Sequence, residues 1–368
     1  MASFQRRGKT WQYTVSRTVN GKQKPLRKGG FRTKKEAQVA AAEVEADLRK
    51  GVVPQLTAIP FSDYFESWLN TFKTDIANNT LERYFNSLQV IKEHFGDLPI
   101  QEINKRSYQA FLNEYGQTHA KASSRKLNTH IRACVRDAID EGMIRVDFTR
   151  DAVFTGDAGK KSSEKHLGYE DSKRLLQLIH KRLDISMTYY LLLLAITSGM
   201  RFGELVGLTR KDFNFFNNTI NIDKSWGYTK SMHEGFGPTK NEDSVRLVKM
   251  DAETMNVFKQ LFKSTPDNIY QLIFYSPSSK YNVISNSAAN KVLIGMLDQL
   301  GTNRITVHGL RHTHASVLLY QGVSVYYVSK RLGHSDIDTT LNTYSHVIKE
   351  MEQRDEQKSA DVFQKMLV

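Results

Sequence analysis

Apolar residues recur every three or four positions between residues 61 and 150, and this spacing constrains the fold more than any other feature of the chain. An apolar stripe of this kind lies along one face of an amphipathic helix. We therefore predict an all-helical segment of four helices, which begin near Ser62, Thr80, Asn104 and Ser123, the last ending before Gly142. The residues predicted to face inward are Tyr64, Phe65, Trp68, Leu69 and Phe72, then Leu81, Tyr84, Phe85, Leu88 and Ile91, then Tyr108, Phe111 and Leu112.

The chain of 368 residues carries a net charge of +13, and the surplus is concentrated in residues 1–50, with 13 Lys and Arg against four Asp and Glu. Such a surplus indicates a polyanionic partner, for which a nucleic acid and a membrane surface are the two candidates. The longest apolar run, residues 189–196, is too short to cross a bilayer, and residues 1–30 are too polar for a signal peptide. The single cysteine, Cys134, excludes an internal disulfide and a thiolate metal cage. We therefore expect a cytoplasmic protein with no membrane association.

The basic amino-terminal segment has the pattern of a small sheet followed by one helix. The predicted strands cover residues 11–19, 22–28 and 29–32, with a type I′ hairpin turn at Asn20-Gly21. Thr33 is the predicted cap of a helix that runs to about Lys50, with Glu36 completing a capping box. A basic sheet on one helix is able to enter a major groove, while the alternative is a solvated basic appendage.

The rest of the chain combines helices with a few strands. Polar or proline-containing linkers are predicted at residues 52–60 and 156–165. Helices are predicted at about 170–182 and 186–197, from Asp251, Asn286 and Thr306, and at 325–331 and 338–346, with strands at 219–222 and 245–249. The tail 349–368 has the pattern of a further helix, whose apolar patch is Val362, Phe363, Met366 and Leu367.

This carboxyl-terminal segment also holds a cationic set with one tyrosine. Its members are Arg201, Lys240, His308, Arg311, His334 and Tyr344. No carboxylate pair, cysteine or hydroxyl triad stands beside them, and fixed cations suit a phosphodiester, whose reaction develops negative charge. His308 and Arg311 are three residues apart and share one helix face, and a guanidinium takes two phosphate oxygens in a fork. The tyrosine supplies a nucleophile.

Several neighbours compete with members of this set. Lys224, Lys230 and Lys249 lie close to Lys240, but a turn-like stretch before the strand at 245–249 favours Lys240. His312 and His314 are predicted to be structural or solvent-facing, on other helix faces than His308. Tyr326 and Tyr327, the nearest rivals of Tyr344, are predicted to be packing residues of an apolar helix.

The ordered set resembles the tyrosine recombinases of the phage-integrase type, over roughly residues 165–350. That family carries, in order, an R-x-x-E box, a lysine in a β-turn, an H-x-x-R box, a G-H box and a tyrosine. The matching residues here are Arg201 with Glu204, Lys240, His308 with Arg311, Gly333 with His334, and Tyr344.

The resemblance implies a chemistry for each residue. Tyr344 would attack the scissile phosphorus, leaving a 3′-phosphotyrosyl bond and a free 5′-hydroxyl, with no ATP, metal or cofactor. Arg201 and Arg311 would hold the non-bridging oxygens, and His334 would add a hydrogen bond there. Lys240 would protonate the leaving oxygen, and His308 would help move the tyrosine proton. Glu204 would orient Arg201.

The resemblance also implies a multidomain α+β fold. An arm-binding domain (1–55) with a three-stranded sheet and a helix would precede an all-helical, SAM-like core-binding domain (56–155) and a linker (156–165). A mainly helical catalytic domain with a small sheet (166–348) and a tail (349–368) in contact with its own or a neighbouring subunit would follow. The predicted DNA-binding residues are Arg17, Lys22, Lys24, Arg27 and Lys28 in the first domain and Lys121, Arg125, Lys126 and Arg132 in the second.

The expected function is a site-specific recombinase that integrates and excises a mobile element such as a prophage. The alternatives are a Xer-like recombinase that resolves chromosomes or plasmids, a transposon integrase of a conjugative element, a type IB topoisomerase, and a DNA-binding regulator without catalysis. Expected partners are double-stranded DNA with core and arm sites, further copies in a homotetramer on DNA, an excisionase and a host DNA-bending factor. The expected location is the bacterial cytosol, at the nucleoid.

Overall fold

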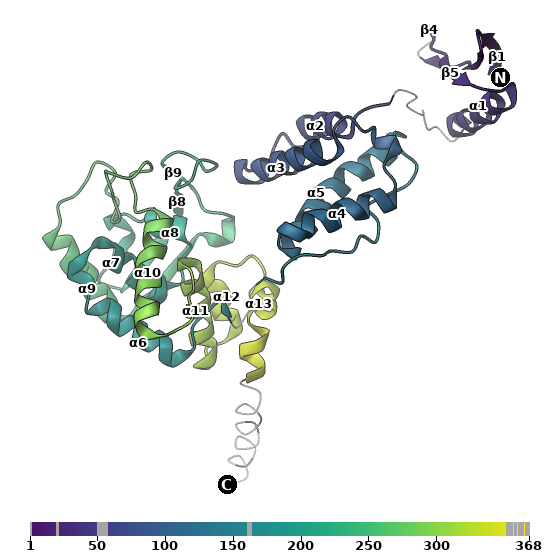
Figure 1. Ribbon diagram of the computed structural model, residues 1–368. Coiled ribbons are helices and arrows are strands. Elements are labelled where there is room, and N and C mark those ends of the chain that lie inside the picture. The colour runs from purple at the N-terminus through teal and green to yellow at the C-terminus, as the bar shows by residue number, and fades with distance from the viewer. Residues whose placement is uncertain are drawn as a thin grey trace. The chain divides into compact units, whose positions relative to one another are not determined.

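The protein is described by a computed structural model that covers residues 2–19, 22–49, 58–159 and 164–350 and the single residues 356, 359 and 364, with the backbone alone for 346–350 (Figure 1). The chain divides into two compact units, residues 1–159 and 160–368. The predicted Asn20-Gly21 turn, most of the linker at 52–60 and the apolar patch of the tail lie outside the described residues.

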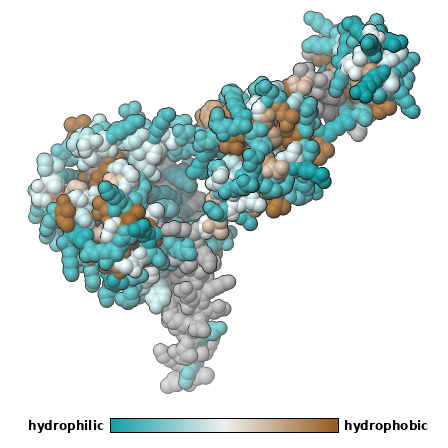
Figure 2. All heavy atoms as spheres, viewed as in Figure 1, coloured by the Kyte–Doolittle hydropathy of each residue, from teal (hydrophilic) through white to brown (hydrophobic). Residues whose placement is uncertain are grey.

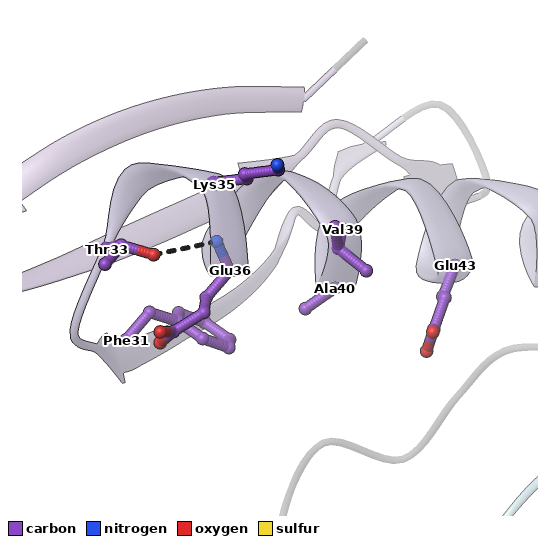
Figure 3. A pocket seen from close by; sticks show the side chains of 7 residues that line it. All are labelled: Phe31, Thr33, Lys35, Glu36, Val39, Ala40 and Glu43. Carbon is purple, nitrogen blue, oxygen red and sulfur yellow. Dashed lines mark hydrogen bonds between the residues drawn. The ribbon is translucent and has the colours of Figure 1, made fainter.

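The amino-terminal sheet has three antiparallel strands in the order β1-β2-β5, and the helix α1 (Lys34–Arg49) packs on it. The strands are β1 (Ala2–Arg7), β2 (Thr10–Val15) and β5 (Leu26–Phe31). Thr33 caps α1, since its Oγ1 accepts a hydrogen bond from the Glu36 N–H at 3.2 Å (Figure 3). A three-stranded sheet on one helix is therefore confirmed.

The members of this sheet differ from the prediction. The strand β1, whose apolar residues are only Ala2 and Phe4, was not predicted, and β5 merges parts of two predicted strands. Gly8 (φ 62°) allows the two-residue turn that pairs Arg7 with Thr10. The short strands β3 (Thr18–Val19) and β4 (Lys22–Gln23) form a separate two-stranded ribbon.

Residues 58–159 form the predicted four helices around one aromatic-rich core. They are α2 (Phe61–Phe72), α3 (Asn78–Phe95), α4 (Lys105–Thr118) and α5 (Lys121–Asp140), with a short 3₁₀ helix, η1 (Ile100–Glu102). Asn104 caps α4 and forms a capping box with Ser107. The inward prediction is wrong for Phe72 and Phe85, which are 52% and 43% exposed. Tyr84 faces Trp68, so Phe85, rotated by about 100° along the helix, points away, and Phe72 lies in the last turn of α2.

The second unit is built around α7 (Met187–Ser198), an apolar helix buried on nearly all sides. Around it pack α6 (Tyr169–His180), α8 (Phe202–Val206), α9 (Ala252–Ser264), α10 (Asn286–Leu300) and α11 (Val307–Tyr320) (Figure 1). A three-stranded sheet has the order β10-β7-β6, with β10 (Arg246–Lys249), β7 (Thr219–Ile222) and β6 (Phe213–Asn214). A separate hairpin joins β8 (Lys224–Trp226) and β9 (Phe236–Pro238), and three 3₁₀ turns are η3 (Leu183–Ile185), η4 (Arg210–Asp212) and η5 (Glu242–Ser244).

The last helices, α12 (Val325–Leu332) and α13 (Ile337–Glu350), pack with α11 around a smaller core that contains Tyr344. All helices and strands predicted for residues 166–348 are present, while β6 and the β8–β9 hairpin were not predicted. The packing prediction for Tyr326 and Tyr327 is wrong, since they are 69% and 45% exposed. Val328 and Leu332, four residues apart, form the buried stripe of α12 instead.

The visible surface of both units is mainly hydrophilic, with scattered hydrophobic side chains (Figure 2). Within the described ranges, no helix is both long enough and apolar enough to span a membrane.

Candidate active site

Arg201 stands at the start of α8, where three protein groups hold its guanidinium. Nη1 donates to Glu204 Oε1 and to Ser244 Oγ, each at 2.8 Å, and Nη2 donates to the Gly333 carbonyl at 2.9 Å. Gly333 ends α12 with a φ of 68°, and a β-carbon there would lie 3.0 Å from atoms of Asp243 and Ser244. A glycine is therefore required where this carbonyl meets the arginine.

Arg311 lies on α11, buried, and joins the ends of two other helices. Its Nη1 donates to the Gly199 carbonyl after α7, and its Nη2 donates to the Leu332 carbonyl at the end of α12, both at 2.8 Å. Because Leu332 and Gly333 are consecutive, the two arginines that bind their carbonyls meet at the end of α12. The two motifs predicted to act together are thus brought to one place.

The charges around this place do not balance. Arg246 on β10 donates to Glu204 at 2.9 Å, so Glu204 is shared by Arg246 and Arg201. Burial alone would raise the pKa of Glu204, but Arg246 and Arg201 outweigh it and hold that pKa below its usual value. Burial, with the charge of Arg201, lowers the pKa of Arg311 to about 9, which leaves it protonated at neutral pH. Two arginines thus share one carboxylate while Arg311 adds a further positive charge, and the surplus favours a bound anion.

Two of the predicted histidines border these arginines. His308 lies in the first turn of α11, and its side chain is exposed on one side. Desolvation by the protein atoms around the ring, followed by the charges of Arg311, Arg201 and Lys240, lowers the pKa of His308. His334 follows Gly333, and its Nδ1 lies 2.8 Å from the Thr340 hydroxyl. Burial, then Arg311 and Arg201, lowers the pKa of His334 to about 4, so its ring is neutral at pH 7.

Two of the three lysines that compete with Lys240 for the role in the site have other partners. Lys224 pairs with Asp212 and Asp223, and Lys249 donates to the Asn217 carbonyl. Lys240 is exposed two residues after β9, and its charge reaches His308. Lys230, exposed in the β8–β9 loop, remains the other candidate. This placement favours Lys240 as the active-site lysine.

Tyr344 is buried, only 2% exposed, and its hydroxyl lies 2.9 Å from Nδ1 of His312. The backbone of α13 leaves helical geometry at this residue (φ −113°, ψ 16°). Burial raises the pKa of Tyr344 to about 12, against the opposing charge of Arg311. The candidate nucleophile is therefore protonated, held by His312, and within electrostatic reach of the arginine site.

The prediction that His312 lies on another helix face than His308 is wrong. His308 and His312 are four residues apart, so both lie on one face of α11, and their ring centroids are 5.0 Å apart. That spacing was the signal in the sequence that could have found His312. The structural prediction for His314 is confirmed, because it is buried between the Ile196 carbonyl and Arg331 Nε, each at 2.9 Å.

Sequence reasoning also missed residues that support the site, namely Ser244, Arg246 and Thr340. The alternation of β10 carries a signal for Arg246, which is buried while Leu247 is 66% exposed. A strand with its arginine inward and its leucine outward departs from a simple core strand. No comparable signal marks Ser244 or Thr340.

The predicted DNA-binding residues occupy different settings. Lys22, Lys24, Arg27 and Lys28 are exposed, whereas Arg17 is half-buried. Arg27 pairs with Thr14 and so lies on the sheet face opposite the buried Tyr13. On α5, the exposed residues are Lys121, Arg125 and Lys126, while Arg132 is half-buried, with its Nε 3.6 Å from Asp147. No group of three potential metal ligands occurs in the part of the chain that the structure describes.

Three known domain families match parts of this chain. Residues 165–351 match the phage integrase family, residues 3–48 an arm DNA-binding domain, and residues 60–115 the N-terminal SAM-like domain of phage integrases. Because the first match alone covers half of the chain, the protein belongs to the phage integrase family of tyrosine recombinases.

Relatives of similar length include integrases of mobile elements. The chain is 25% identical to the integrase of Staphylococcus phage L54a, in an alignment that covers 86% of this chain and 97% of the relative. It is 25% identical to a XerC-like tyrosine recombinase of Caldanaerobacter subterraneus, in an alignment that covers 91% of each chain. The integrase of the element ICEBs1 of Bacillus subtilis is 21% identical, over 86% of each chain.

Solved structures share the fold at low identity. An integrase of the transposon Tn1549, solved with a circular intermediate DNA, aligns with a TM-score of 0.65 at 17% identity, over 80% of this chain and 99% of that chain. A lambda integrase dimer bound to a core site aligns with a TM-score of 0.58 at 17% identity, over 90% and 91% of the two chains.

Proposed function

We propose that this protein is an integrase that breaks and rejoins DNA through a 3′-phosphotyrosine bond, to integrate and excise a mobile element. One observation carries the proposal. The Tyr344 hydroxyl lies within electrostatic reach of Arg311, whose guanidinium meets that of Arg201 at the end of α12. A nucleophile beside a site with surplus positive charge fits attack on a phosphodiester.

Each residue of the site takes a role in this chemistry. Arg201 and Arg311 hold the non-bridging oxygens of the scissile phosphate, and buried Glu204 orients Arg201. His334, fixed through Nδ1 by Thr340, turns its other ring nitrogen to the phosphate. Lys240 protonates the departing 5′-oxygen, and His308 contacts the phosphate. Acid or base assistance of this kind contributes about 10²–10⁴-fold.

The reaction exchanges one phosphate ester for another, so rejoining needs no ATP. The arginines supply the positive charge that a metal ion supplies in other phosphoryl-transfer enzymes. Tyr344 is only 2% exposed in the free protein. Its hydroxyl must therefore become accessible to the phosphate when DNA binds.

Double-stranded DNA is the proposed substrate. The surplus of Lys and Arg in residues 1–50 and the exposed Lys121, Arg125 and Lys126 suit phosphate contacts. Arg27 and Thr14, on the outer face of the sheet, suit base contacts at arm sites. The Tn1549 and lambda integrase structures are complexes with DNA, which supports the same partner here.

Recombination between two sites would use a homotetramer on DNA, assisted by an excisionase and a host DNA-bending factor in the bacterial cytosol. A Xer-like resolving recombinase is the second candidate, favoured by the XerC-like relative. The match of residues 3–48 to an arm DNA-binding domain favours the integrase. An integrase of a conjugative element stays within the proposal, given the ICEBs1 relative.

The test uses the full chain and a nicked suicide substrate that carries the attachment site, identified from direct repeats flanking the gene. Tyr344→Phe is expected to abolish the covalent protein–DNA adduct and to leave DNA binding unchanged. An adduct that still forms in this variant would show that Tyr344 is not the nucleophile.

A second experiment tests the arm domain. Deletion of residues 1–55 is expected to spare cleavage at core sites and to impair integration. Unimpaired integration would contradict the arm assignment.

A further inference from the structure

We propose that His312 is the group that takes the proton of the Tyr344 hydroxyl during strand cleavage and returns it during rejoining. This inference rests on the proposed function, in which Tyr344 is the nucleophile. It assigns to His312 the proton transfer that the family resemblance gives to His308.

The contact between the two residues carries the inference. Nδ1 of His312 and the hydroxyl of Tyr344 are 2.9 Å apart, a hydrogen-bond distance to the atom that would attack phosphorus. His308 lies one turn earlier on α11 and is exposed. Among the described contacts, the Tyr344 hydroxyl is hydrogen-bonded to His312. The rings of His308 and His312 meet edge to face, with His308 exposed and His312 half-buried.

The surroundings fix both partners of this hydrogen bond. His312 follows Arg311, whose two hydrogen bonds tie α11 to the ends of α7 and α12. The ring of Tyr344 packs in a core with Ala315, Leu319, Val328 and Leu332. The pair is therefore held in place before DNA arrives.

The charges facing His312 keep it able to accept a proton. The groups that face it are His308 and Arg311 on α11, Lys165 and His166 before α6, and Tyr344 on α13. Burial first, and then the electrostatic effect of the basic groups among them, lowers the pKa of His312 to about 4. An imidazole that is neutral at pH 7 is free to accept a proton, whereas an imidazolium is not.

The proton transfer balances in both directions. In cleavage, the bond between Tyr344 Oη and phosphorus forms and the phenol proton moves to His312 Nδ1, while the bond from phosphorus to the 5′-oxygen breaks and that oxygen takes a proton from Lys240. In rejoining, a 5′-hydroxyl attacks phosphorus and gives its proton back to Lys240, the bond between phosphorus and Tyr344 Oη breaks, and His312 returns its proton to the phenol oxygen. The pKa of Tyr344, about 12, and that of His312, about 4, lie far apart in the free protein. The negative phosphate raises the pKa of the imidazole, and the forming ester bond lowers the proton affinity of the phenol oxygen.

The experiment compares single-turnover adduct formation by His312→Asn, His312→Ala and His308→Asn in the full chain. An asparagine amide oxygen lies near the position of Nδ1 and accepts a hydrogen bond, but it cannot take the proton. Each variant meets two suicide substrates, one with the natural 5′-oxygen and one with a bridging 5′-sulfur, whose thiolate leaves without a proton. Melting temperature and DNA binding report whether each variant folds.

His312→Asn and His312→Ala are expected to lose about 10²–10⁴-fold in rate on both substrates. Lys240→Ala, the control for the other end of the reaction, is expected to be slow on the oxygen substrate alone. Replacing Tyr344 by 3-fluorotyrosine lowers the pKa of the phenol, and it is expected to restore part of the rate in His312→Asn.

Three results separate the possibilities. Adduct formation at the rate of the unaltered protein in His312→Asn overturns the inference, because the hydrogen bond alone then suffices. A defect that disappears with the 5′-sulfur substrate also overturns it, since His312 would then act on the leaving group. An adduct in Tyr344→Phe contradicts the proposed function itself. If His312→Asn does not fold, His312→Ala and the fluorotyrosine protein decide the same question.

Discussion

Basic residues gather in two kinds of region of this protein, and they are exposed in one and held by hydrogen bonds in the other. In residues 22–28 and on α5, the lysines and arginines are mostly exposed, where salt screens them and each contributes separately. Around Tyr344, Arg201, Arg246 and Arg311 are held by hydrogen bonds to a shared carboxylate, a hydroxyl and helix-end carbonyls. The exposed set suits attraction of DNA, and the bonded set suits a fixed geometry around one phosphate.

Among the variants that compare these two regions, Lys240→Ala is expected to have the largest effect on rate. Loss of the general acid should slow cleavage by about 10²–10⁴-fold, and a 5′-sulfur substrate should restore it, because the thiolate needs no proton. Lys230→Ala is the matched control from the same loop region. If Lys230→Ala shows the restorable defect and Lys240→Ala does not, the lysine assignment is wrong.

Arg311→Ala tests the bonded set directly. Removal of one preorganised donor to a developing oxyanion costs about 10²–10³-fold in rate, and single-turnover cleavage of a core-site substrate measures it. The loss of its bonds to Gly199 and Leu332 should also lower the melting temperature. Arg27→Ala, in the exposed set, should leave core-site cleavage unchanged; an equal loss in both variants would remove the distinction between the regions.

Glu204→Gln should reduce stability, because Arg201 and Arg246 would lose their buried counter-charge. Breaking a buried ion pair costs about 3–5 kcal/mol. The folded pKa of Glu204 lies below its usual value of 4.5, so its stabilising effect is present above that value and is lost as the pH falls through the folded pKa. Melting curves of the two proteins should therefore differ most near neutral pH and converge in acid. A constant difference across that range would contradict the charge-based account.

The smallest effect is expected for Lys126→Ala on α5. Loss of one phosphate contact should weaken core-site binding modestly and reduce the slope of log affinity against log salt by about 0.9. Binding titrations at several salt concentrations measure this slope, and Lys92→Ala is a control, since Lys92 pairs with Glu66. An unchanged slope would show that Lys126 does not contact a DNA phosphate.

The sequence predicted what depends on local spacing. Caps at Asn104, Asp251 and Thr306, the apolar stripes and the order of the catalytic motifs all follow from neighbours within a few positions. It did not predict which distant segments meet. Arg311 with Gly199 and Tyr344 with His312 depend on how helices pack, which the spacing within one helix does not fix. The strand β1 was missed because its alternation is weak.

The most direct test of the central claim is to locate the covalent bond to DNA by mass spectrometry. Trypsin cleavage after Arg331 and Lys349 yields the peptide 332–349, in which Tyr344 is the only tyrosine. The account predicts that the protein trapped on a suicide substrate carries its nucleotide adduct on this peptide. An adduct on the preceding peptide, 312–330, which contains Tyr320, Tyr326 and Tyr327, would contradict it.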